Sequence, residues 1–171
     1  MSYAEMLLPE FDHKMASTRK VLERIPDNKL DWKAHPKSNT IGWNANHLAE
    51  LPGWATAIFE QNEYDFAPVG GERYQSPNLK STKEIVALFD ANVAKARKAI
   101  AAAKDESMGD AWTLRGGERH IFTMPRAAVV RGFLMSHIIH HRAILCVYLR
   151  LNDIPVPALY GPSGDEAPPG K

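Results

Sequence analysis

The sequence has little of what marks a secreted or membrane-bound protein. Cys146 is its only cysteine, so the chain cannot form a disulfide within itself. No apolar run approaches the roughly 18 residues that a membrane span requires. The first residues, MSYAEMLLPEFDHK, carry acidic side chains where a secretory signal would carry basic ones. We therefore expect a cytoplasmic protein that has no membrane partner.

The chain also lacks an excess of charge of either sign. Lysine and arginine total 21, aspartate and glutamate total 20, and the formal net charge is +1. Proteins that bind nucleic acids or anionic membranes generally carry a basic surface, so this balance argues against a nucleic-acid partner. A chain of 171 residues, 44% of them hydrophobic, can bury one substantial core, and we expect residues 1–171 to form a single domain.

The spacing of hydrophobic residues predicts four long helices. They cover about residues 3–25, 40–61, 82–104 and 125–151, and residues 152–171 form a C-terminal tail that contains several prolines. Pro52 lies inside the second helix and should kink it, because proline has no N–H to donate to the carbonyl of Leu48. Ser81 and Glu84 form a capping-box signature at the start of the third helix. Pro125 fits the first turn of the fourth.

Two connections between these helices are also informative. In AWTLRGGERHIF, two β-prone runs flank Gly116 and Gly117, which predicts a small β-hairpin before the fourth helix. Residues 63–80 contain several prolines and glycines and form the longest irregular segment, a kind of loop that often carries function. Four long helices in a chain of this size predict an all-α fold, a four-helix bundle.

His137 and His141 lie one helical turn apart in SHIIHHRAIL, about 40° from each other around the helix. Val130, Leu134 and Tyr148 point in a similar direction, so both histidines should face the core. Their Cβ atoms are expected about 5–6 Å apart, close enough for both imidazoles to reach one ion. The pair is therefore either part of a metal site or two buried structural histidines that bond to carbonyls or water.

A catalytic metal site typically has three protein ligands and one open position. His47 is the favoured third ligand, because it centres the apolar face of the second helix in NANHLAELPGW. Glu50 is close enough to orient a ligand or move a proton, although a surface or helix-stabilising role fits it equally well. His140 lies at the edge of the stripe and either contacts a ligand from outside, flanks the pocket or only packs. Trp43 and Tyr148 are expected to line the pocket.

Two blocks of sequence resemble the DinB/YfiT-like family of small metal-binding proteins. They are KAHPKSNTIGWNANHLAEL and, further along, SHIIHHRAILCVYLRLNDIPVPALYGPSGDE, and the resemblance runs over about residues 26–166. It implies a bundle in up-down-down-up order, with a divalent metal on His47, His137 and His141, whereas His140 is not a usual ligand. Relatives often have HHRGQL where this chain has HHRAIL, so any role of a polar residue at Ile144 is lost here.

The resemblance also implies a chemistry. Some relatives are transferases or isomerases that use a low-molecular-weight thiol, and others have been linked to hydrolysis. We therefore expect a metal-dependent enzyme with one divalent ion, zinc or nickel before iron or manganese, that activates a water or a thiol cosubstrate toward a small-molecule substrate. The alternatives are a non-catalytic metal-binding bundle with a structural or partner-binding role, and a metal-free core.

Helix four is apolar on more than its core face. Ala128, Met135, Ile139 and Cys146 lie about 140–180° around the helix from the His137 and His141 stripe. A helix that is apolar nearly all round must be covered on both sides, here by the 63–80 loop, by the tail or by a second subunit. Because a two-fold dimer can bury one stripe against itself, we expect a homodimer through helix four.

Overall fold

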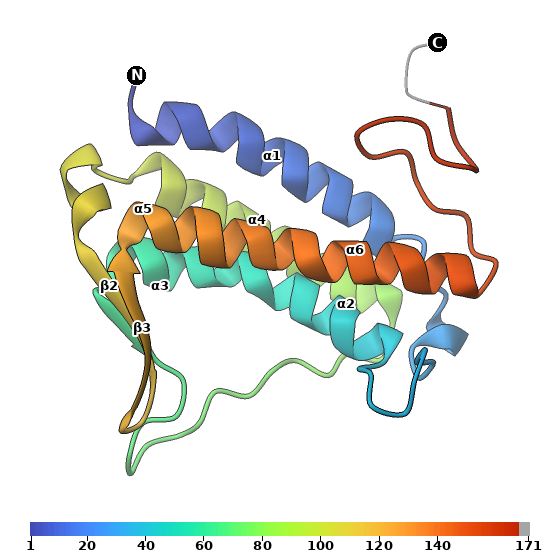
Figure 1. The fold of residues 1–171 in the computed structure, drawn as a ribbon, viewed down its shortest axis with the longest axis horizontal. Helices are drawn as coiled ribbons and strands as arrows, with labels where there is room; N and C mark the ends of the chain where they lie inside the picture. Colours follow the sequence, from blue (N-terminus) through green and yellow to red (C-terminus); the bar gives the residue numbers. More distant parts are fainter. Residues whose placement is uncertain (168–171) are drawn as a thin grey trace.

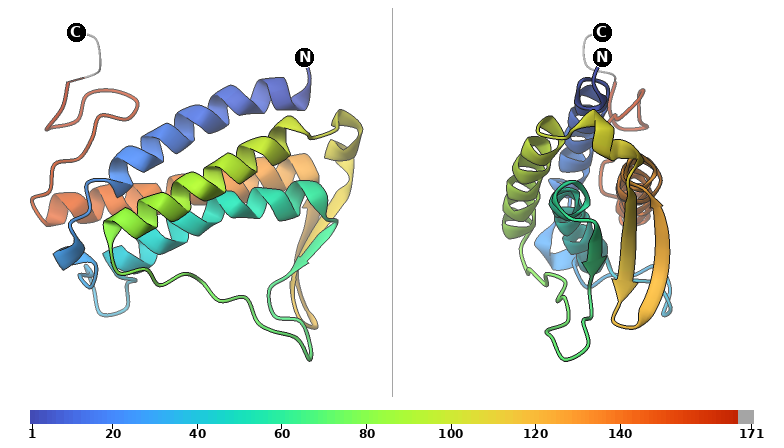
Figure 2. Two further views of the ribbon diagram at one scale, coloured as in Figure 1. Left: turned by 180° about the vertical axis from the view of Figure 1, so that it is seen from behind. Right: turned by 90° about the vertical axis from the view of Figure 1, so that its left-hand side faces the viewer.

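Four long helical segments pack side by side as a bundle, and a small three-stranded sheet lies at one end (Figures 1 and 2). The computed structural model describes residues 1–167. The first segment is α1, Tyr3–Leu22, and the third is α4, Thr82–Ala101. The second and fourth segments are each divided into shorter pieces. A mostly helical bundle with a hairpin before its last helix agrees with the prediction.

The second segment is broken at Pro52, as its sequence predicts. It consists of α2 (Ile41–Glu50), one 3-10 turn (Leu51–Gly53) and α3 (Trp54–Glu60). Thr40 starts α2, because its side-chain oxygen accepts the N–H of Trp43 at 3.0 Å. α3 lies next to α4 and β1, whereas α2 packs against α4 and α6.

The fourth segment contains a π-helical turn that the sequence pattern does not reveal. It consists of α5 (Arg126–Ala128), the π-helical turn (Val129–Met135) and α6 (Ser136–Leu151). Pro125 is the last residue of a strand and the cap of α5, one position before the helix where it was expected. Because α6 is a regular α-helix, the predicted relation between His137 and His141 holds.

Two helix ends differ from the prediction. α1 stops at Leu22 and not near residue 25, because Pro26 disfavours the helical conformation in the residue before it. A 3-10 turn at Asp27–Lys29 follows. α4 stops at Ala101 and not near residue 104, and the chain continues into a second 3-10 turn at Asp105–Gly109. The start of α4 is as predicted, with Ser81 as its cap.

The sheet consists of the predicted hairpin and one additional strand. β2 (Ala111–Gly116) and β3 (Arg119–Pro125) pair antiparallel, and Gly117 has a positive φ of 64° in the turn between them. β1 (Glu63–Asp65) pairs parallel with the other edge of β2, inside the segment that the sequence predicts to be irregular. The sheet is fixed to the bundle by Trp112, which is fully buried and donates from Nε1 to the carbonyl of Ala57 at 3.2 Å.

The chain between β1 and α4 crosses one side of the bundle. In Figure 1 it runs below the helices, from the end near the hairpin to the start of α4 at the other end. Asn46 of α2 holds this loop, because its side-chain oxygen accepts the N–H of Leu79 at 2.8 Å and its nitrogen donates to the Leu79 carbonyl at 3.1 Å. The loop is therefore attached to α2 close to the predicted site residues.

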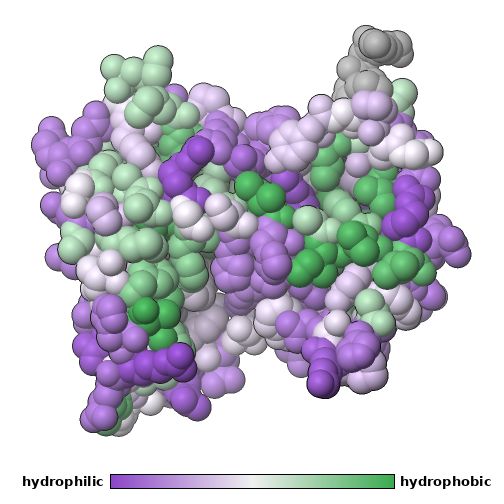
Figure 3. All heavy atoms as spheres, in the orientation of Figure 1, coloured by the Kyte–Doolittle hydropathy of each residue, from purple (hydrophilic) through white to green (hydrophobic). Residues whose placement is uncertain are grey.

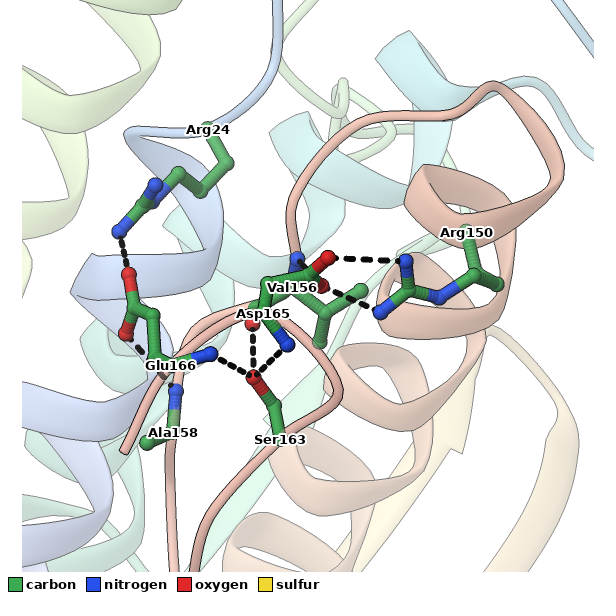
Figure 4. A network of polar contacts seen from close by, with 7 residues as sticks. All are labelled: Arg24, Arg150, Val156, Ala158, Ser163, Asp165 and Glu166. Atoms are coloured by element: carbon green, nitrogen blue, oxygen red, sulfur yellow. Dashed lines mark hydrogen bonds and ion pairs between the residues drawn. The ribbon is translucent and has the colours of Figure 1, made fainter. Parts of the chain in front are cut away.

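The tail folds back onto the bundle through a network of polar contacts (Figure 4). Asp165 pairs with Arg150 of α6, and Glu166 pairs with Arg24 just after α1. Ser163 supports the turn between them, because its hydroxyl donates to the Val156 carbonyl at 2.7 Å. The tail thus connects the ends of two helices. The last four residues of the predicted tail lie outside the described residues.

The far side of helix four is only partly uncovered. Met135 is buried within the chain, Ile139 and Cys146 are half-buried, and Ala128 is exposed. Other residues of the chain therefore cover part of this apolar stripe, and a second subunit is not needed to cover that part. Figure 3 shows hydrophobic side chains at the surface along α6, where Val147 and Leu151 are 56% and 58% exposed. Among residues 1–167, none of the helices is long and apolar enough to cross a membrane.

Candidate metal centre

His47 of α2 meets His137 and His141 of α6 inside the bundle. One ring nitrogen from each of the three lies within 4.8 Å of the others. The Nε2 atoms of His47 and His137 are 3.2 Å apart, and the ring of His141 is centred 4.7 Å from that of His47. His141 is buried and the other two are half-buried. The structure therefore brings together the three histidines that the sequence analysis selected.

Two neighbouring side chains determine which nitrogen of His47 and His141 carries the proton. Nδ1 of His47 bonds to a carboxylate oxygen of Glu50, and Nδ1 of His141 lies 2.9 Å from the amide oxygen of Asn44. The amide nitrogen of Asn44 donates to the Thr40 carbonyl, which fixes the amide orientation. Since both oxygens accept, each Nδ1 donates a proton and each Nε2 keeps its lone pair.

Glu50 is itself held by the loop that crosses the bundle. Its side chain is 4% exposed, the Tyr74 hydroxyl donates to one oxygen at 2.7 Å, and the Ser76 hydroxyl donates to the other at 3.3 Å. The carboxylate is thus used by His47 and by two loop hydroxyls. Within residues 1–167, the cluster contains the three histidines and no acidic or cysteine side chain. The arrangement corresponds to a three-ligand site with an open position.

The surroundings keep the two α6 histidines neutral. Burial, together with the nearby imidazoles of His47 and His140, lowers the pKa of His137 to about 4. Burial also lowers the pKa of His141 to about 3, again together with the neighbouring histidines. Both rings therefore carry a free lone pair at neutral pH, which is the form that binds a metal ion.

The donor set fits a divalent transition metal. Two nitrogens bound at about 2.0–2.1 Å in a tetrahedral site lie roughly 3.3 Å apart, close to the spacing of the His47 and His137 Nε2 atoms. Three imidazoles suit zinc, nickel and iron. Nδ1 of His137 is buried and has no hydrogen-bond partner within the part of the chain that the structure describes. This ring is therefore oriented by packing, against Phe133 at 5.4 Å, and not by a carboxylate or amide.

The other predicted site residues fall in two different places. The Trp43 ring stacks on His47 at 4.9 Å and is 42% exposed, and His140 is exposed and lies edge-on against His141 at 4.9 Å. These two side chains border the cluster on its exposed side. Tyr148 is buried in the core and packs edge-on against Trp32 at 5.3 Å.

Sequence reasoning did not identify three residues that the structure brings to the cluster. Asn44 precedes His47 by three residues, so a buried amide on the same helix face was a usable signal. Tyr74 lies on an irregular loop, where no periodicity predicts a contact. Phe133 lies in the π-helical turn, where the regular helical spacing does not apply.

Comparisons with known proteins support the fold described above. The chain matches two crystal structures of DinB-like proteins, each with a TM-score of 0.68. One, from Bacillus cereus, is 22% identical, and the match covers 91% of this chain and 97% of that one. The other, YjoA from Bacillus subtilis, is 16% identical, with 90% and 97% covered. No curated protein matches the chain. The model of the DinB superfamily matches residues 10–145, and the chain belongs to that superfamily.

Proposed function

We propose that the protein is a metal-dependent enzyme that holds one divalent ion on His47, His137 and His141. The observation that carries the proposal is the convergence of three imidazoles, two of which are bonded through Nδ1 to buried oxygen acceptors. Histidine ligands of metals nearly always have such partners. The expected up-down-down-up order of the four helical segments, and zinc or nickel as the ion, are part of the same proposal.

The chain's own residues have distinct roles in this proposal. Glu50 and Asn44 hold the protons of His47 and His141 at Nδ1, so that both Nε2 atoms are ligands. Trp43 covers one side of His47, and Phe133 excludes water from one side of His137. When bound, a divalent ion with an open position supplies Lewis acidity, which lowers the pKa of a water or thiol that occupies it. A thiol-dependent transferase and a hydrolase both begin with that deprotonation.

Glu50 is the group best placed to exchange a proton next to this site. Its carboxylate already contacts one ligand ring and two hydroxyls, Tyr74 and Ser76. The same contacts distinguish the proposed enzyme from the non-catalytic alternative. In that alternative the site is closed and Glu50 is the fourth ligand. Because Glu50 bonds to Nδ1 of His47, across the ring from the Nε2 atom that would bind the ion, the geometry supports the open site that the enzyme requires.

The proposal is tested with protein loaded with zinc or nickel. It is incubated with low-molecular-weight thiols and electrophilic substrates in one panel, and with esters and amides in a second. We expect turnover in one panel that disappears with a chelator and in His141→Ala. Stoichiometric metal binding without turnover in either panel would support the non-catalytic bundle. Turnover that survives metal removal would contradict the proposal.

A further inference from the structure

A cavity of about 370 Å³ lies on the opposite side of Glu50 from the histidine cluster, bounded by the break between α2 and α3, by α4 and by the crossing loop. Its size is within the range of small-molecule sites. Glu50 contributes to its wall, whereas none of the three clustered histidines does. The cavity is therefore a separate chamber next to the candidate metal centre.

Three aromatic side chains surround this chamber. The rings of Trp54 and Tyr64 are centred 5.6 Å apart, and those of Tyr64 and Tyr74 are 6.4 Å apart at an angle of 72°. They come from α3, from β1 and from the loop, so the chamber is formed only when these three elements are assembled. Leu88 and Pro77 add apolar surface. A lining of several aromatic side chains is a typical binding environment for an organic cation.

The polar groups of the chamber are acceptors and carry a negative charge. Glu50 is its only charged lining residue, and no lysine, arginine or histidine lines it. Asn92 donates from Nδ2 to the Ala49 carbonyl at 2.9 Å, and its Oδ1 accepts no hydrogen bond from residues 1–167. Burial raises the pKa of the Tyr64 hydroxyl, and the negative charge of Glu50, which lines the same chamber, raises it further.

We propose that this chamber binds a small organic amine in its protonated form, with the ammonium group directed to Glu50 and the Asn92 amide oxygen and its apolar body between Trp54, Tyr64 and Tyr74. The charge of Glu50, the free acceptor and the aromatic lining all select a cation with N–H donors over a neutral or anionic molecule. The proposal goes beyond the proposed enzyme activity and does not depend on it, because the chamber contains no metal ligand.

The test uses metal-free full-length protein and two probes that differ in charge, phenethylammonium and its neutral analogue 2-phenylethanol, in calorimetric titrations. We expect saturable one-site binding of the ammonium, about tenfold or more tighter than binding of the alcohol. Glu50→Gln should remove this preference and leave binding of the alcohol unchanged. Trp32→Phe, which alters an aromatic residue that packs on Tyr148 away from the chamber and from the histidine cluster, is the matched control and should change neither.

A second variant keeps the test decisive if Glu50→Gln does not fold. Leu88→Trp fills the chamber from α4 without touching the Glu50 contacts and should abolish binding of both probes. Equal affinity for the two probes, or failure of the ammonium to bind, would overturn the proposal. So would an ammonium preference that persists in Glu50→Gln, or ammonium binding that survives in Leu88→Trp. All these readouts are made without metal, so they are independent of any failure to find turnover.

Discussion

Asn44 and Glu50 show how single residues prepare the histidine cluster. A neutral imidazole has one N–H and one lone pair, and only the hydrogen bond on one side determines which faces the ion. The amide oxygen of Asn44 provides this for His141 at 2.9 Å. Residues that hold metal ligands in this way typically change metal affinity by about 10–100-fold when they are removed.

We therefore predict that Asn44→Ala weakens zinc binding by about 10–100-fold, because the His141 ring loses its anchor. Asn44→Asp should largely restore the affinity, since a carboxylate oxygen is also an acceptor. The measurement is a competition titration against a chromophoric chelator. An unchanged affinity in Asn44→Ala would show that packing alone orients His141.

A second prediction at this scale concerns pH and the metal-free protein. An unfolded chain has histidine pKa values of about 6.5, whereas His137 and His141 have pKa values of about 4 and about 3 in the folded protein. Below pH 6.5 the unfolded state binds protons that the folded state does not, so stability is full above pH 6.5 and falls as the pH approaches 4. Between pH 7 and pH 5.5, each histidine should lower the free energy of unfolding by roughly 1 kcal/mol.

Urea denaturation of metal-free protein at these two pH values measures this loss. His137→Leu should show a smaller loss, because one of the two groups is gone. His13→Ala is the control and should behave like the parent protein, since His13 is exposed and does not contact the cluster. An equal pH dependence in His137→Leu and the parent would contradict the account of the buried neutral rings.

The candidate site was predictable to the extent that its residues lie on regular helices. His137 and His141 follow from the period of an α-helix, and His47 follows from its position on the apolar face of α2. The contacts of Tyr74 and Ser76 with Glu50 join a loop to a helix, and no local pattern encodes them. The chamber behind Glu50 was unpredictable for the same reason.

At the scale of elements, a buried arginine stabilises the point where the second and fourth helical segments meet. Arg126 at the start of α5 is 3% exposed and donates to the carbonyl oxygens of Ile58 and Gln61 at the end of α3, as well as to the Asn62 side chain at 3.0 Å. The last carbonyls of a helix have no partner within that helix, so Arg126 satisfies them from outside. It thereby connects the second and fourth helical segments beside the sheet.

We predict that Arg126→Met lowers the free energy of unfolding by about 2–3 kcal/mol, because it keeps the apolar stem but leaves buried carbonyls unpaired. Arg97→Met is the matched control. Arg97 forms an exposed pair with Asp12, and its loss should change stability by less than about 1 kcal/mol. Chemical denaturation of both variants measures the difference. Equal effects would contradict the role given to Arg126.

The elements themselves were predictable where one apolar stripe defines them. α1 and α4 follow this rule, α6 was predictable from its long apolar run, and Pro52 predicted the break after α2. The π-helical turn was not predictable, because its buried residues, Val129, Val130, Leu134 and Met135, also fit the spacing of a regular α-helix. β1 has only three residues and forms because the edge of β2 is available, which is a property of the folded chain and not of the segment.

At the scale of the whole molecule, α6 presents apolar surface that residues 1–167 leave exposed. Val147 and Leu151 are more than half exposed, and the folded tail leaves them open while it covers part of Cys146. Such a stripe can be buried against its own copy across a two-fold axis. We propose, as the sequence led us to expect, that the protein is a homodimer through helix four.

This proposal predicts that Val147→Glu shifts the protein from dimer to monomer, because two carboxylates would face each other across the axis. Ile139→Glu tests the adjacent part of the helix surface, a little more than about two turns earlier. Val69→Glu, on an exposed loop position, is the control and should leave the assembly unchanged. Sedimentation velocity distinguishes the species. A dimer that survives Val147→Glu and Ile139→Glu, or a parent protein that is monomeric, would contradict an interface at helix four.

The central claim is that one divalent ion is held by His47, His137 and His141, and metal content tests it most directly. Metal-free protein is reloaded with zinc, desalted and measured by mass spectrometry of the element, together with four single alanine variants of the clustered histidines and His140. We expect about one ion per chain in the parent and in His140→Ala, and strongly reduced content in the other three. Equal loss in all four variants, or no bound ion in the parent, would contradict the claim.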